Sequence, residues 1–564
     1  MSEEVSMIRY GAAIFFFIWY IIISTVANIG FIEILLKFRH RTLLSSSSTS
    51  AITKSKRQRK YKKEIGEEVE NNDANLTYEG VTIIRPIKGI DPELSSCLES
   101  SFVQNYPLDK MQILFCIDDP HDPSIPMIKK LINKYPTIDA EILVSDNFDP
   151  ETNSSSEHYG PNPKVNNLAK GFLKAKYDIL WVMDSNVWAS SNILRNSVFT
   201  MNMNLNNGRK LGSKRPVKLV HHVPLAMCID SDGDASIPDL EGRVTPTNSE
   251  DDSDYASITS QSSNLTNRKA LANSQLNIDQ QLNHCYQNHE SRKLLGAKLD
   301  EMFLHSSHSK FYVALNNLSI APCVNGKSNM YRKSDLDQAV KLIPYKNSPF
   351  FSDTKVKSDA QYYTSLGLGH AIKFFARYIG EDNMIGIALW ENCNGRTGLT
   401  GDVVVQPLSR HDNTVQDYIQ RRVRWLRVRK YMVSLATFIE PTTESIVCGI
   451  YGTFAVSTLF FHQWFSIKWF LIHMTAWCLS DFVQYNVLIN HAKSTASANM
   501  TYLPRWMDNI HVVHSLRDAG EWLQVWLLRE LLALPIWFSA MFGHEIDWRG
   551  KPFKIKKDLT AEEL

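Results

Sequence analysis

The stretch Met111–Asp122, MQILFCIDDPHD, holds seven mostly apolar residues followed at once by a cluster of carboxylates. A short apolar run of this kind is typical of a strand that is buried on both faces of a parallel sheet. In open α/β sheets, ligands bind outside the carboxyl ends of the strands. The stretch therefore predicts a central strand at 111–117 and a ligand site at its carboxyl end.

Other apolar runs on either side of this strand alternate with stretches of helical spacing. The predicted strands are Val81–Arg85, Met111–Ile117, Ala140–Val144, Asp178–Met183 and Lys218–Val223, and the predicted helices are Ser124–Tyr135 and Lys164–Ala175. Strands that alternate with helices favour a mostly parallel sheet. We therefore predict an α/β domain with helices on both faces of its sheet.

The N-terminal region contains an apolar segment, Ala12–Leu36, of 25 residues with one charge, Glu33. As a helix it is roughly 37 Å long, which is enough to cross the hydrocarbon core of a bilayer. Basic residues follow it, and the run 54–63 contains seven lysines and arginines with no acid. The positive-inside rule puts the N-terminus in the lumen and the following domain in the cytosol. We interpret the segment as an uncleaved transmembrane anchor.

The C-terminal third is strongly apolar beyond Ile439. Its candidate membrane segments are Ser445–Phe465, Ile467–Ile489 and Leu523–Phe542. The last of these contains Arg529 and Glu530, which would be costly at membrane depth unless they face protein or water. We therefore expect about three C-terminal transmembrane or interfacial helices.

Composition divides the 564 residues into five regions: an anchor (10–36), a basic and polar linker (37–79), a cytosolic α/β domain (80–438), a membrane region (439–547) and a tail (548–564). Within the α/β domain, 230–295 is acidic and then rich in serine, which predicts a disordered insertion. The net charge of +2 is too small to suggest a nucleic-acid partner. The eight cysteines form no C-x-x-C pair, so reduced thiols fit better than a zinc site or a disulfide framework.

Carboxylates follow two of the predicted strands. Asp118, Asp119 and Asp122 follow the second strand, and Asp184-Ser185-Asn186 follows the fourth. Parallel strands bring these groups to one edge of the sheet, where oxygen ligands, with Asn186 nearby, suit Mg²⁺ or Mn²⁺ that bridges a diphosphate. The alternative is that each aspartate only caps the helix that follows it.

A further motif, Asn162–Leu168, opens a predicted helix with the ammonium group of Lys164 and three side-chain amides. A helix N-terminus with these groups suits the diphosphate of a nucleotide-sugar. Asn166 could instead be a capping residue.

Glu381–Asp382 follows a mixed apolar and basic segment, Gly369–Tyr378, which we interpret as a helix that can lie among lipid headgroups. An acid at this place could take a proton from an acceptor hydroxyl. His308 is a weaker candidate, because a lone surface histidine is its default interpretation.

The run Arg421-Arg422-Val423-Arg424-Trp425 lies between the α/β domain and the apolar third. Arg421 and Arg424 are three residues apart and so share one helical face, and guanidinium groups suit phosphate oxygens. Trp425 adds a rigid apolar wall. An anion site next to carboxylates at a membrane surface predicts chemistry on a phosphorylated donor with an acceptor on the lipid side.

In their order along the chain, these features resemble the GT-A glycosyltransferases of family 2 type, which carry three spaced aspartates and a terminal (Q/R)-x-x-R-W box beside the membrane. More narrowly, the chain resembles a fungal form of glycosyltransferase family 21. The matching segments are Arg85–Asp91, His121–Pro123, Asn162–Leu168, Asp184–Ser185, Ser307–His308, Glu381–Asp382, Arg421–Trp425 and the tail from Trp548 to Glu563.

The resemblance implies UDP-glucose as donor, ceramide as acceptor, inversion to a β-glucosyl linkage, and a Golgi or ER membrane with the catalytic domain facing the cytosol. It implies Asp382 as the general base, Asp184 as the ligand of a divalent cation or of the diphosphate, and Arg421, Arg424 and Trp425 as catalytic groups that help UDP leave. The substrate-binding residues that it implies are Lys88, Asp118, Asp119, Asp122, Lys164, Asn166 and His308. Which of the three clustered aspartates contacts the nucleotide stays open.

One departure from the wider family 2 pattern is Asp184-Ser185-Asn186 in place of D-x-D, which leaves one carboxylate for a metal and implies weak metal dependence. Three other functions stay open. A processive polysaccharide synthase shares the motifs but needs more membrane helices for a pore, and a transferase could act on another lipid, such as dolichyl phosphate or a sterol. A non-catalytic membrane scaffold would be expected to have lost part of the site.

Overall fold

The computed structural model describes residues 7–38, 78–145, 148–149, 154–155, 158–202, 215–229, 295–409, 413–499, 504–508, 516–543, 545–548, 551–556 and 559–564. Most of the predicted linker 37–79 and of the predicted insertion 230–295 lies outside these residues.

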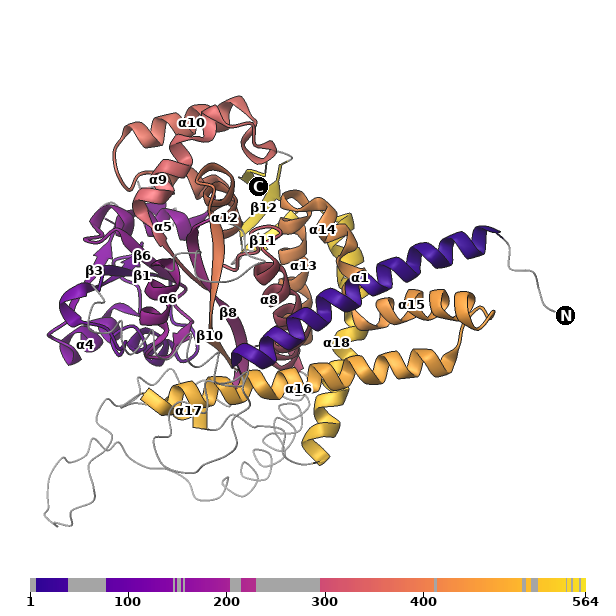
Figure 1. Cartoon of the computed structure of the whole chain (residues 1–564). Coiled ribbons are helices and arrows are strands. Elements are labelled where there is room, and N and C mark those ends of the chain that lie inside the picture. The colour runs from indigo at the N-terminus through magenta and orange to yellow at the C-terminus, as the bar shows by residue number, and fades with distance from the viewer. Residues whose placement is uncertain are drawn as a thin grey trace, which may run out of the picture.

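A sheet of eight strands forms the centre of the α/β domain (Figure 1). In spatial order the strands are β3 (Asp139–Val144), β2 (Met111–Ile117), β1 (Val81–Ile87), β6 (Ile179–Met183), β9 (Ser328–Arg332), β8 (Val217–Ile229), β10 (Arg396–Ser409) and β7 (Trp188–Ala189). The first four are parallel, and so are β8 and β10. The sheet is mixed, because β9 is antiparallel to both its neighbours and β7 is antiparallel to β10. All five predicted strands are present.

Helices cover both faces of this sheet, which confirms the predicted fold class. Ile83 and Trp181 pack on one face, whereas the adjacent residues Ile84 and Leu180 pack on the other, as the two-residue repeat of a strand requires. The first face is covered by α3 (Leu94–Glu99), α4 (Ile125–Lys134) and α6 (Ile193–Asn202), and the second by α5 (Pro163–Lys174), α9 (Lys333–Lys341) and α12 (Glu381–Asn392). Burial on both faces explains why these strands are continuous apolar runs.

Short elements complete the domain: η2 (Leu108–Lys110), β4 (Phe148–Asp149), β5 (Ser154–Ser155), η4 (Ile343–Tyr345), η5 (Pro349–Phe351), α10 (Thr354–Ser365), α11 (Ala371–Phe374) and η6 (Phe375–Arg377). The expectation of a headgroup helix at 369–378 is wrong. Phe374, Phe375 and Tyr378 are buried in the core beneath α5 and α12. The apolar residues of this segment serve the domain core and not a lipid surface.

A second layer of helices packs against the domain (Figure 1). Its members are α1 (Met7–Phe38), the π turn η3 (Leu304–His308), α8 (Ser309–Leu318), α13 (Val415–Met432), α14 (Ser434–Ile439), η7 (Glu440–Thr443), α15 (Ser445–Phe460), α16 (Ile467–Asn499), α17 (Arg505–Asp508) and α18 (Leu516–Phe542). α1 lies along α8 and α15, and the long strands β8 and β10 extend into the same core. The layer is therefore continuous with the sheet.

Two helices in the described part of the chain, Met7–Phe38 and Asp518–Phe542, are long and apolar enough to cross a membrane. A third span is possible if the pair Ser434–Thr443 and Ser445–Phe460, bent by 75°, counts as one broken or re-entrant segment. All three predicted C-terminal segments are largely helical, but α16, although 33 residues long, is not one of the helices apolar enough to count as a candidate span.

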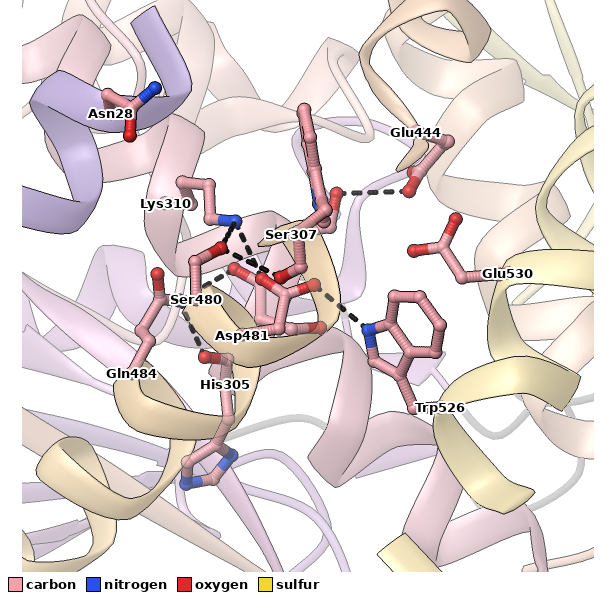
Figure 2. Close-up of polar contacts among 12 residues, drawn as sticks. Asn28, His305, Ser307, Lys310, Glu444, Ser480, Asp481, Gln484, Trp526 and Glu530 are labelled. Atoms are coloured by element: carbon pink, nitrogen blue, oxygen red, sulfur yellow. Dashed lines mark hydrogen bonds and ion pairs between the residues drawn. The ribbon is translucent and has the colours of Figure 1, made fainter. Parts of the chain in front are cut away.

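A buried polar network joins α16 and α18 to η3 and α8 (Figure 2). Lys310 pairs with Asp481 at 2.7 Å, and Trp526 donates to the same carboxylate at 2.9 Å. Arg529 pairs with Glu444 at 2.8 Å and also with Glu530. The sequence left open whether Arg529 and Glu530 face protein or water, and the structure shows that both are almost fully buried in protein.

The tail forms a small sheet of β11 (Glu545–Trp548), β12 (Lys551–Ile555) and β13 (Ala561–Glu563). Ile546, Phe553 and Ile555 pack against Ile379, three residues before Asp382. Lys430 on α13 donates to the carbonyl groups of Met541 and Gly543 at the end of α18. These contacts bring the C-terminal tail back to the α/β domain.

Candidate active site

One large cavity, of about 1190 Å³, lies where the sheet meets the second helical layer. Every site residue predicted from the sequence lines it: Lys88, Asp118, Asp119, Asp122, Lys164, Asn166, Asp184, His308, Asp382, Arg421, Arg424 and Trp425. These residues come from parts of the chain more than 300 positions apart. The expected convergence of acidic loops and paired arginines is therefore present, whereas the role of each residue stays a prediction.

Asp184 directly follows β6 and lies in this cavity between two ammonium groups. Lys164 Nζ lies 2.9 Å from Asp184 Oδ1, and Lys327 Nζ lies 3.2 Å from Asp184 Oδ2. Lys327 reaches the site because β9 runs antiparallel to β6, so the start of β9 lies at the carboxyl end of β6. The backbone N–H of Asp184 donates to the Lys327 carbonyl group at 3.1 Å, which fixes the two segments together.

Buried Arg85 holds the loop that follows β6. Its guanidinium group donates to the carbonyl groups of Asp184 and Val187, at 3.1 and 3.0 Å. Ser185 donates to Asp91 at 2.7 Å. The Arg85–Asp91 segment, which the sequence marked as a matching motif that contains Lys88, therefore contributes to the wall of the cavity.

The lysines determine the charge state of Asp184. Burial alone would raise the pKa of this carboxyl group, but the attraction of Lys164 and Lys327 outweighs burial and lowers the pKa to about 2. In the same way, burial would lower the pKa of Lys164, but Asp184 and Glu381 raise it. Asp184 is therefore an anion whose two oxygens already face cations.

This arrangement does not fit a metal ion held by the protein alone. Both oxygens of Asp184 face ammonium groups, and the described residues contain no group of three or more His, Cys, Asp or Glu side chains that could hold a metal. Asn186, proposed to lie beside the metal, accepts from Lys327 Nζ at 3.3 Å. Metal ligation by Asp184 remains a prediction.

Asp382 lies at the start of α12, which is tied directly to the start of α5. Asn162 caps α5 by accepting from the N–H groups of Lys164 and Val165, and it donates to Glu381 Oε2 at 2.9 Å. Lys164 Nζ lies 3.0 Å from Glu381 Oε1. The capping role considered for Asn166 thus belongs to Asn162, while Asn166 donates to Gly160 and accepts from Tyr159 to shape the preceding loop.

The surroundings of Asp382 suit a base. Burial, and then the charge of Glu381, raises the pKa of Asp382 to about 7, although Lys164 opposes the shift. The carboxyl group lies against Gly326, where an added Cβ atom would approach Asp382 Oδ2 at 3.4 Å and Lys164 Nζ at 3.3 Å. A glycine at this position leaves the space in front of Asp382 open.

The three clustered aspartates have different surroundings. Asp122 is buried, and its carboxylate accepts from the Gly89 N–H group at 2.7 Å and from Ser124. Gly89 has a φ of +71°, a conformation that favours glycine, so Asp122 holds the loop that presents Lys88. Asp118 pairs with Lys170 at 2.9 Å, and Asp119 is more exposed and accepts from the His121 N–H group.

His308 ends the π turn η3, and its ring stacks on that of Tyr312 with centroids 5.1 Å apart. Burial, helped by Arg422 and Arg429, lowers the pKa of His308 to about 3, so the imidazole is neutral at physiological pH. Gln484 donates to the carbonyl groups of His305 and Ser306 and stabilises the turn, as Figure 2 shows. His308 is thus part of a fixed wall and not a lone surface histidine.

Arg421, Arg424 and Trp425 lie on α13, as the helical spacing predicts. Arg421 pairs with buried Asp300 and donates to Asn413 at 2.8 Å. Trp425 packs beside Phe303. The sequence did not single out Asp300, because it follows the long insertion and lies 121 positions from its partner.

Comparison with known proteins shows the family of the chain. Residues 43–210 and 369–561 match the family described as Glycosyl transferase family 21. A ceramide glucosyltransferase of Candida albicans is 61% identical over the full length of both chains. Ceramide glucosyltransferases of Komagataella phaffii (42% identical, 98% of this chain and 92% of that one) and of Gibberella zeae (34%, 86% and 85%) are also similar. Among solved structures, a mannosyltransferase from Pyrobaculum calidifontis in complex with GDP-Man and Mn²⁺ is similar at 11% identity and a TM-score of 0.32, over 92% of this chain and 96% of that one.

Proposed function

The chain belongs to glycosyl transferase family 21 and is a glycosyltransferase. From this premise we propose that it transfers glucose from UDP-glucose to the primary hydroxyl group of ceramide. The product is glucosylceramide with a β linkage. The observation that carries the proposal is that Asp382 shares one cavity with cations suited to a diphosphate, while α1 forms another wall of that cavity.

The cationic side chains supply the donor end of the site. Lys164 and Lys327 lie on either side of Asp184, and Arg421 and Arg424 of α13 line the same cavity. We propose that the diphosphate of UDP-glucose binds between them, because ammonium and guanidinium groups stabilise the charge that develops on the leaving phosphate. Lys88, Asp118, Asp119 and Asp122 would then surround the uridine side, with Asn166 and His308 at the margins of the site.

Asp382 supplies the base in this proposal. The ceramide oxygen attacks the anomeric carbon on the side opposite to the diphosphate, and its proton moves to Asp382. The bond between the anomeric carbon and the β-phosphate oxygen breaks, and UDP leaves with the electron pair. A carboxyl group with a pKa near 7 is matched to this task at physiological pH.

No step of this mechanism depends on a divalent cation. Both oxygens of Asp184 face ammonium groups that can neutralise the diphosphate. Weak metal dependence, with Mg²⁺ or Mn²⁺ entering on the donor, is the expectation that fits these residues. We also propose that the enzyme is a multi-pass protein of the Golgi or ER membrane with its catalytic domain in the cytosol.

The proposal is tested by incubating membranes that contain the protein with labelled UDP-glucose and a short-chain ceramide. We expect labelled glucosylceramide whose label a β-glucosidase releases. Parallel reactions replace the donor by UDP-GlcNAc, or the acceptor by dolichyl phosphate or a sterol. Polymer from UDP-GlcNAc, product only with another lipid, or no product with any acceptor would overturn the proposal.

A further inference from the structure

One wall of the cavity is an apolar stripe of the N-terminal helix α1. Trp19, Ile22, Ile23 and Val26 line the cavity, and their spacing of three and four residues puts them on one helical face. The sequence predicted α1 only as a membrane anchor. A helix that served only as a membrane anchor would not need one face to line the active-site cavity.

Further apolar lining residues come from the region of η3 and α8, and they form a second apolar wall. Phe303, which directly precedes η3, lines the cavity together with Phe311 and Leu315 of α8, and Ala436 and Ile439 of α14 extend the wall. Protein interiors contain few voids larger than a water molecule. The volume of about 1190 Å³ also exceeds the range of about 300–1,000 Å³ that is usual for one small ligand. The apolar half of this cavity therefore needs an occupant of its own.

The elements around this half belong to the membrane side of the molecule. Ile22 lines the cavity and is 45% exposed, and Ile18, one helical turn before it, is also exposed. Leu435 and Phe438 of α14 are exposed in the same layer, next to Ala436. An exposed apolar surface that continues into an apolar cavity suits a ligand that arrives from the bilayer.

The position of α1 in this wall is fixed by polar contacts. Trp19 Nε1 donates to Thr442 Oγ1 in η7 at 3.0 Å, and Tyr20 is hydrogen-bonded to His473 of α16 at 2.9 Å. Gly30 of α1 lies so close to the backbone of Lys310 that an added Cβ atom would clash with it. The wall is therefore built into the fold and does not depend on a chance approach of two helices.

We propose that this apolar half, between α1 and the wall of η3, α8 and α14, binds the hydrocarbon chains of the ceramide acceptor. The inference rests on the proposed function and adds its lipid subsite. The chains would extend along Ile23 and Val26, which leaves the polar head at the junction with the charged half, where Asp382 lies. α1 is then a substrate-binding element as well as an anchor.

The test compares two acceptors and two tryptophan variants of the full-length enzyme. The acceptors are a palmitoyl ceramide and a truncated ceramide in which both hydrocarbon chains are short. Val26→Trp fills the proposed subsite, whereas the control Ile21→Trp adds the same bulk to the opposite face of α1, outside the cavity lining. KM and kcat are measured for each acceptor, together with KM for UDP-glucose.

We expect Val26→Trp to raise KM for palmitoyl ceramide about tenfold or more, because several methylene groups lose their burial. KM for the truncated acceptor and for UDP-glucose should stay within about twofold of the wild-type values, and Ile21→Trp should change none of them. Equal loss with both acceptors, as a structural phospholipid in this space would produce, overturns the inference, and so does no change with either. A wild-type enzyme that uses neither acceptor refutes instead the proposed function.

A second measurement avoids the risk that Val26→Trp does not fold. Wild-type enzyme is photolysed with a ceramide that carries a diazirine near the end of its acyl chain, and labelled peptides are identified by mass spectrometry. We expect label in α1, η3, α8 or α14 that excess unlabelled ceramide suppresses. Competed label found only outside these elements contradicts the inference.

Discussion

Among the ion-pair clusters of the described residues, two have very different surroundings. Lys164, Asp184 and Lys327 lie in the cavity, with 17–24% of each side chain exposed. Lys310 and Asp481 lie between η3, α8, α16 and α18, with at most 2% of each side chain exposed, as Figure 2 shows. A ligand can therefore reach Lys164, Asp184 and Lys327, which we call the open cluster. No ligand can reach Lys310 and Asp481, which we call the sealed cluster.

The difference indicates what each cluster does. In the proposed function, the cations around Asp184 exchange part of their pairing for the charges of an incoming diphosphate and so serve binding and catalysis. Lys310 and Asp481 can reach no ligand, so they fix how the apolar helices meet the catalytic domain. Changes in the open cluster should alter kinetics with little effect on stability, and changes in the sealed cluster should do the reverse.

The largest effect is expected in the open region, for Asp382→Asn. Loss of the general base should lower kcat by about 10²–10⁴-fold, while the amide keeps the shape of the side chain and the thermal unfolding midpoint stays the same. Glucosylceramide formation by purified enzyme measures the rate. An Asp382→Asn variant as active as the wild-type enzyme would remove the base from the mechanism.

The second prediction concerns the sealed cluster. Asp481→Ala leaves the buried ammonium group of Lys310 unpaired, which should reduce the free energy of unfolding by about 3–5 kcal/mol. Denaturant unfolding of the detergent-solubilised protein measures the loss. The double change Lys310→Met with Asp481→Leu should restore much of the stability. Breaking the exposed pair Lys556–Glu562 with Glu562→Ala is the control, with a loss of at most about 1 kcal/mol.

In the open cluster, Lys327→Ala should lower kcat about a hundredfold, because one cation near the leaving phosphate is lost. Its unfolding midpoint should match that of the wild-type protein. Lys174→Ala is the matched control, because Lys174 carries the same charge, is exposed, and does not line the cavity. If Lys327→Ala instead unfolds the protein and Lys174→Ala does not, the open cluster is structural and the contrast between the two regions fails.

The smallest effect is expected from removal of divalent cations. A metal that acted as a Lewis acid would contribute several kcal/mol to the transition state. Since lysines already neutralise the site, treatment with EDTA should lower the rate less than about tenfold. A loss of several hundredfold that Mn²⁺ reverses would show that Asp184 exchanges its lysines for a metal.

The same contrast explains what the sequence could and could not predict. Asp118 and Asp184 were found because parallel strands end at one edge of a sheet, which is a local rule. Lys327 was missed because its place depends on β9 running antiparallel, and this direction is not visible in the strand itself. Phe374 was misinterpreted because an apolar residue beside a lysine looks the same in a domain core and at a membrane surface.

The contribution of α1 to the cavity was missed for a related reason. Its stripe of Trp19, Ile22 and Val26 lies within a helix that is apolar on all sides, so periodicity cannot single it out. The sealed pair of Lys310 and Asp481 joins residues 171 positions apart, which only tertiary packing brings together. Conversely, Arg421 and Arg424 were predictable, because their helical spacing and position before the apolar third are both local features.

The most direct test of the open site is the pH dependence of kcat/KM for ceramide at saturating UDP-glucose. Burial raises the pKa of Asp382 to about 7, and only the ionised carboxylate can accept the proton. As the pH falls below this pKa, the base becomes protonated, so kcat/KM should fall about tenfold per pH unit, with its half-maximum near pH 7. A value that stays constant from about pH 5.5 to 8, in enzyme that remains folded, would contradict the role of Asp382 as the base.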